Sequence, residues 1–109
     1  MGRLNWLEVC KHAHELWPDN SQAAIGLGTA YYKLGRLSEA QNAICSFADA
    51  DQNAVVALNN CAQILAEKGR LQDAILYAER GAAIPGAFQQ ICAETLNKVR
   101  SQIEAGANW

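Results

Sequence analysis

Apolar residues recur three and four positions apart along most of the chain, which is the spacing of one face of an α-helix. Six segments show this pattern: residues 4–17, 21–34, 38–50, 55–68, 71–84 and 88–105. Pro18, Gly35, Gly69 and Pro85-Gly86 interrupt it, and these residue types end helices. Ser21 is a suitable N-cap for the second segment. We therefore expect an all-α protein of about six helices.

A hexapeptide recurs 34 residues along the chain, because Gly35-Arg36-Leu37-Ser38-Glu39-Ala40 returns as Gly69-Arg70-Leu71-Gln72-Asp73-Ala74. A fixed period of this length is typical of stacked helical hairpins, each of which buries its apolar side against its neighbours. We expect a single domain over residues 1–109. Its parts are the second helix of an incomplete repeat (1–18), two full repeats (21–54 and 55–86) and a capping helix (87–105).

Small and large residues at fixed places within the repeat identify its type. In the first unit these are Leu27, Gly28, Tyr31, Gly35, Ala40 and Ile44, and in the second Ala62, Leu65, Gly69, Ala74, Ala78, Gly81 and Pro85. On these residues the chain resembles the tetratricopeptide repeat family over about residues 21–86. The resemblance implies a helix-hairpin solenoid that acts as a protein–protein interaction module, a scaffold or adaptor.

Composition and charge argue against several other partners. The chain has 109 residues, a formal net charge of −2 and no run of Lys or Arg, so electrostatic capture of nucleic acid or of an anionic membrane is not expected. No stretch of apolar residues is long enough to span a bilayer, and the first residues lack the apolar run of a secretory signal. We expect a cytoplasmic protein.

The residues that could carry chemistry are scattered along the chain. Cys10, Cys45, Cys61 and Cys92 form no C-x-x-C pair, so we interpret them as residues that fill the core. No motif of a known hydrolase or metalloprotease occurs, and no pair of acids stands on an apolar background. We therefore expect no enzyme activity, no cofactor and no metal site.

The resemblance also implies where a ligand binds. In this family the first helices of successive hairpins line a concave groove that holds an extended peptide or a single helix. Carried over position by position, the groove residues are Gln22, Ile25, Thr29, Tyr32, Lys33, Val56, Asn59, Gln63, Glu67, Gln90 and Asn97. Members that bind chaperone tails hold a carboxylate with basic residues and asparagines, whereas Ile25 and Thr29 occupy two of those places here. The remaining amides and apolar side chains favour a neutral or mildly basic peptide.

Two alternatives stay open at this point. The apolar residues of the first helix, Leu4, Trp6, Leu7 and Trp17, face no partner helix in the chain and could join two copies into a homodimer. In that structural hypothesis the groove is unused. The chain also resembles the pentatricopeptide arrays, which bind RNA with a repeat one residue longer. The strict 34-residue period and the acidic balance favour protein binding over RNA binding.

Overall fold

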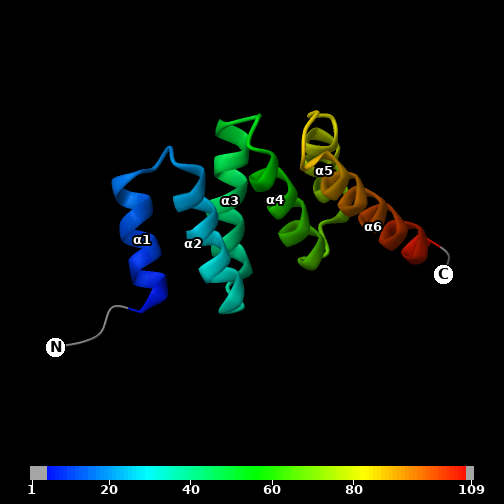
Figure 1. The fold of residues 1–109 in the computed structure, drawn as a ribbon. Coiled ribbons are helices and arrows are strands. Elements are labelled where there is room, and N and C mark those ends of the chain that lie inside the picture. The colour runs from blue at the N-terminus through cyan, green and yellow to red at the C-terminus, as the bar shows by residue number, and fades with distance from the viewer. Residues whose placement is uncertain (1–4, 108–109) are drawn as a thin grey trace.

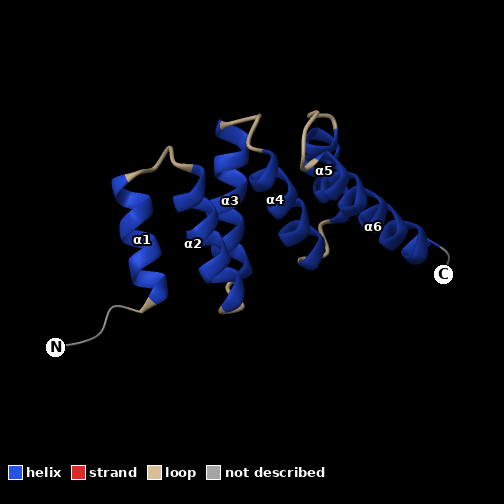
Figure 2. Cartoon of the chain, in the orientation of Figure 1, coloured by secondary structure: helices blue, strands red, loops and turns tan. Residues whose placement is uncertain are grey.

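The computed structural model describes residues 5–107, which fold into six α-helices joined by short turns, with no strand among them (Figures 1 and 2). The helices are α1 (Trp6–Leu16), α2 (Ser21–Lys33), α3 (Leu37–Ala50), α4 (Val55–Glu67), α5 (Leu71–Ala82) and α6 (Gln89–Ala107). Each segment predicted from the apolar spacing contains one of these helices, so the all-α prediction is confirmed.

The helices stack side by side in chain order. Each helix packs on the next, and the first helices of successive hairpins also touch, α2 with α4 and α4 with α6. Figure 1 shows a row that runs from α1 to α6, and its principal extents are 55 × 32 × 19 Å. This elongated shape is that of a solenoid, in which each repeat contacts only its neighbours.

The recurring hexapeptide forms the turn inside each hairpin. Gly35 and Gly69 have φ angles of 77° and 81°, a left-handed backbone that glycine adopts more readily than any other residue. The N–H of the arginine that follows donates to the carbonyl of Tyr31 in the first turn and of Leu65 in the second, at 2.9 Å in each. This is the Schellman ending of a helix, and it starts the reversal of the chain.

The arginine after each glycine also holds the start of the next helix. Arg36 Nε lies 2.6 Å from Glu39 Oε1, and Arg70 Nη2 lies 2.7 Å from Asp73 Oδ2. Both acids stand in the first turn of their helix, where a negative charge interacts favourably with the helix dipole. The exchange of Glu39 for Asp73 between the two copies keeps this pair.

Gly69→Ala is expected to lower the free energy of unfolding by about 1–2 kcal/mol, because alanine disfavours the left-handed backbone. No atom lies within 4 Å of a Cβ placed at Gly69, so the loss would report backbone conformation rather than a clash. Urea denaturation measures it. The control is Gly106→Ala in α6, which is equally open and is expected to stabilise by up to about 1 kcal/mol. Equal shifts for both variants would contradict this account of the turn.

Small residues allow the helices to approach closely. Ala24, Ala57 and Ala74 have no exposed surface. Gly28 of α2 leaves no room for a side chain, because a Cβ atom there would overlap Ile44 of α3. A core made of such contacts needs few aromatic residues, which explains why only 7% of the chain is aromatic.

Two cysteines correct the interpretation from sequence. Cys45 of α3 and Cys61 of α4 form a disulfide, with their Cα atoms 5.0 Å apart, instead of filling the core as separate thiols. Cys10 and Cys92 are free and buried, as packing residues are. The disulfide joins the second helix of one hairpin to the first helix of the next. The two positions become neighbours because α3 packs on α4.

The start of α2 differs by one residue from the prediction. Asn20 is the N-cap, and its side-chain oxygen accepts a hydrogen bond from the N–H of Ala23 at 3.0 Å. Ser21 is the first residue of the helix instead. Both residue types cap helices well, so the sequence pattern alone did not separate them.

The last helix turns its apolar face partly to solvent. Cys92 and Val99 are buried, as expected, but Phe88 and Ile91 are 48% and 45% exposed. They belong to the first turn and its approach, where α6 reaches beyond the surface of α5 that it covers. The predicted apolar stripe is therefore correct only from Cys92 onward.

Candidate functional site

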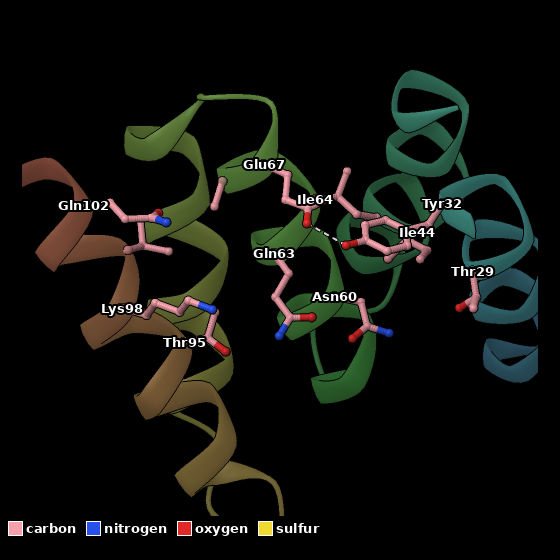
Figure 3. Close-up of a pocket in the computed structure, with 12 residues that line it drawn as sticks. Thr29, Tyr32, Ile44, Asn60, Gln63, Ile64, Glu67, Thr95, Lys98 and Gln102 are labelled. Atoms are coloured by element: carbon pink, nitrogen blue, oxygen red, sulfur yellow. Dashed lines mark hydrogen bonds between the residues drawn. The ribbon is translucent and has the colours of Figure 1, made fainter. Parts of the chain in front are cut away.

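A cleft of about 390 Å³ lies across the first helices of the hairpins, α2, α4 and α6 (Figure 3). Its lining consists of Thr29, Tyr32, Ile44, Asn60, Gln63, Ile64, Ala66, Glu67, Thr95, Lys98, Val99 and Gln102. Because successive hairpins repeat one orientation, their first helices come together on one side of the solenoid. The cleft is therefore a direct product of the repeat.

The floor of the cleft is apolar and its middle is polar. Ile44, Ile64 and Val99 are at most 3% exposed and line the floor. Figure 3 shows the side chains of Asn60 and Gln63 projecting from α4 between α2 and α6. A primary amide both donates and accepts hydrogen bonds, so these two side chains can pair with the backbone of an extended ligand.

A hydrogen bond joins two hairpins at one side of the cleft. The hydroxyl of Tyr32 donates to Glu67 Oε1 at 2.6 Å, drawn as the dashed line in Figure 3. This bond raises the pKa of Tyr32, and partial burial and the charge of Glu67 raise it further. The phenol therefore keeps its proton at physiological pH, and the bond fixes the carboxylate at the end of α4.

The opposite side of the cleft belongs to α6 and carries a positive charge. Thr95, Lys98 and Gln102 point from α6 toward α4. Lys98 forms no ion pair with any other described residue. The cleft thus has an anion, Glu67, on one side and a cation on the other, with amides between them.

Four of the predicted groove residues line this cleft: Thr29, Tyr32, Gln63 and Glu67. They are the residues for which the 34-residue offset between α2 and α4 holds well. Their role in binding a ligand stays a prediction.

The other predicted groove residues lie outside the lining. Ile25 packs against the core, Asn59 is only 8% exposed, and Gln90 donates to Glu94 on its own helix. The remaining four are Gln22, which lines a second cleft beside α1, and Lys33, Val56 and Asn97. None of these seven side chains belongs to the surface that α2, α4 and α6 share.

A rotation of about one residue explains these differences. On α4 the cleft takes Asn60 where Asn59 was predicted, and on α6 it takes Lys98 where Asn97 was predicted. One residue turns the direction of a side chain by about 100°, so this shift replaces the residues that face the ligand. Counting from the buried residue Val99, instead of from the repeat offset, would have placed Lys98 correctly.

The residues predicted for self-association divide between two faces of α1. Trp6 and Trp17 are 66% and 59% exposed. Leu7 packs against the core instead, because it follows Trp6 by one residue and so points about 100° away. Leu4 lies outside the described residues.

Other kinds of site find less support among the described residues. No three His, Cys, Asp or Glu side chains in this part of the chain come together as a metal site would require. None of the described helices has the length and hydropathy needed to cross a bilayer. The cleft between α2, α4 and α6 is therefore the candidate functional site.

Comparison with known proteins agrees with this architecture. A search of curated proteins gave no match. A family model described as Tetratricopeptide repeat matches residues 25–89, more than half of the chain. The match begins within α2, covers both glycine turns and ends at the first residue of α6. It confirms the helix-hairpin solenoid, and the chain belongs to the tetratricopeptide repeat family.

Proposed function

We propose that this chain binds a peptide segment or a single helix of a partner protein in the cleft between α2, α4 and α6. Membership of the tetratricopeptide repeat family supports a role in protein–protein interaction, and we propose no catalytic activity. The observation that carries the proposal is the lining of the cleft, an apolar floor below two amide side chains. Pockets that bind ligands combine an apolar surface with a few polar groups in this way.

The charges of the cleft favour a ligand of mixed charge. A basic side chain of the ligand would lie near Glu67, and an acidic one near Lys98. An apolar side chain between them would cover Ile64 and Val99. We therefore propose a partner segment that is close to neutral, with an apolar residue between two opposite charges. In the cell the module would act as a scaffold or adaptor.

Selection of peptides from a random library on the whole protein tests this proposal. Peptides that bind are expected to lose about 10-fold or more in affinity on Asn60→Ala combined with Gln63→Ala, because two hydrogen-bonding groups of the cleft are removed. Isothermal titration calorimetry measures the change. Lys98→Glu is expected to weaken peptides that carry an acidic residue and not the others.

The control for this experiment is Gln72→Ala, an exposed glutamine of α5 outside the cleft, which is expected to leave the affinity unchanged. A selection that yields no binding peptide, or peptides that tolerate the double substitution, would overturn the proposal. Salt-sensitive binding of single-stranded RNA that Lys98→Glu abolishes would favour the RNA alternative instead.

The disulfide bears on where the protein would function. The sequence predicts a cytoplasmic protein, and this stays a prediction. The Cys45–Cys61 disulfide supports an oxidising compartment instead, because cytosolic thiols are kept reduced. Thiol titration of protein isolated from its natural source under acid quenching would decide between the two locations.

A further inference from the structure

The outer side of α1 carries a second cleft, of about 470 Å³, at the end of the row of helices (Figure 1). The helix contributes Trp6, Val9, Cys10, Ala13 and Trp17, and the start of α2 closes the other side. None of the residues that line this cleft is charged. Two tryptophans that are more than half exposed on an uncharged surface are unusual for a monomer in solution.

The repeat identifies this cleft as the seat of a helix. Moving 34 residues along the chain takes Trp6 to Ala40 and Ala13 to Phe47, which are 0% and 9% exposed. In that hairpin α2 packs on α3, and a Cβ at Gly28 would lie 3.4 Å from the carbonyl oxygen of Ala40. The equivalent surface of α1 has no helix over it among the described residues.

The order of sizes along the seat is reversed relative to the hairpin. In α3 the small residue, Ala40, comes first and the large one, Phe47, comes two turns later. In α1 the large residue, Trp6, comes first and the small one, Ala13, comes two turns later. A helix shaped like α2 would therefore meet the indole of Trp6 where it needs an alanine. The occupant must place a small residue over Trp6 and a large one over Ala13.

We propose that the occupant is α1 of a second copy, which runs antiparallel and forms a symmetric dimer. In an isologous contact residue i meets residue j and j meets i. Trp6 of each copy then covers Ala13 of the other, and Val9 and Cys10 meet close to the twofold axis. Large residues face small ones at both ends, which is the arrangement of a well-packed helix pair.

Area and charge both fit a second copy. Trp6, Val9, Leu16 and Trp17 are between 41% and 66% exposed, which corresponds to roughly 400–500 Å² of apolar surface per copy. Interfaces are about 60% apolar, so the contact would bury about 700–800 Å² per copy, close to the standard size of about 800 Å² per partner. Two identical uncharged surfaces also meet without repulsion.

Sedimentation equilibrium of the whole chain over a range of concentrations tests the dimer. The wild type is expected to pass from monomer to dimer as concentration rises. Trp6→Ala is expected to raise the dissociation constant about 100-fold, since the symmetric contact loses two anchor residues at once. Ala13→Trp is expected to have a similar effect, because two large residues then collide.

The double variant Trp6→Ala with Ala13→Trp exchanges the large and small residues and is expected to restore the dimer. Leu76→Ala is the matched control, since Leu76 of α5 is 60% exposed but lies outside this surface, and it should leave the dissociation constant unchanged. Circular dichroism establishes that each variant is folded. A wild type that stays monomeric at millimolar concentration, or a double variant no better than the single ones, overturns the proposal.

Discussion

Gly28→Val is expected to lower the free energy of unfolding by about 2–3 kcal/mol. A Cβ atom at this position would overlap Cγ1 and Cδ1 of Ile44, and Ile44 is only 2% exposed. Neither side chain can move into solvent, so α2 and α3 must separate. Overpacking of this kind costs about 1–3 kcal/mol, and valine regains little of it as a helix former. Urea denaturation followed by circular dichroism measures the loss.

Gly26 provides the matched control on the same helix. A Cβ at Gly26 would lie 3.9 Å from Cys10 Sγ, an ordinary contact, so Gly26→Ala is expected to stabilise by about 0.5–1 kcal/mol through helix propensity. Ile44→Ala tests the cause at Gly28, because Gly28→Val combined with Ile44→Ala would fill about the same volume as the native pair. We expect the double variant to be more stable than the sum of the single losses by at least about 1 kcal/mol. Strict additivity would contradict the proposed overlap.

The second hairpin shows why this exchange is sound. The residues 34 positions after Gly28 and Ile44 are Ala62 and Ala78, both of which are fully buried. The two hairpins therefore solve one packing problem in two ways, with a glycine facing a large residue or with two alanines. The fold follows from such local pairs, and the repeated hexapeptide makes it predictable from the sequence.

Features that depend on how helices turn against one another were harder to predict. The offset of 34 residues assumes that every first helix has the same rotation, and it places Asn97 in the cleft. The packing of α6 on α5 and α4 turns Lys98 there instead. The same limit applies to Leu7, which was predicted beside Trp6 but faces the core. Periodicity identifies the apolar side of a helix, and the neighbouring helices decide its rotation.

Reduction of the Cys45–Cys61 disulfide is expected to lower the free energy of unfolding by about 3 kcal/mol. The two cysteines are 16 residues apart, and closing a loop of about this length removes roughly 3 kcal/mol of entropy from the unfolded chain. Cys45 is 7% exposed and Cys61 is fully buried, so the bond should be reduced in urea before refolding. Urea titrations with and without dithiothreitol then measure the difference.

The location of this bond determines what its loss should do. It joins α3 to α4, the junction between the two full repeats, and a solenoid is held together by such junctions. Reduction should therefore weaken the coupling between the repeats and lower the denaturant slope as well as the midpoint. The control is Cys45→Ala combined with Cys61→Ala, whose stability should not respond to reductant. Denatured protein should release two thiols, from Cys10 and Cys92, before reduction and four after it. Equal stability of the two forms despite those thiol counts would show that the repeats are coupled by packing of α3 on α4 alone.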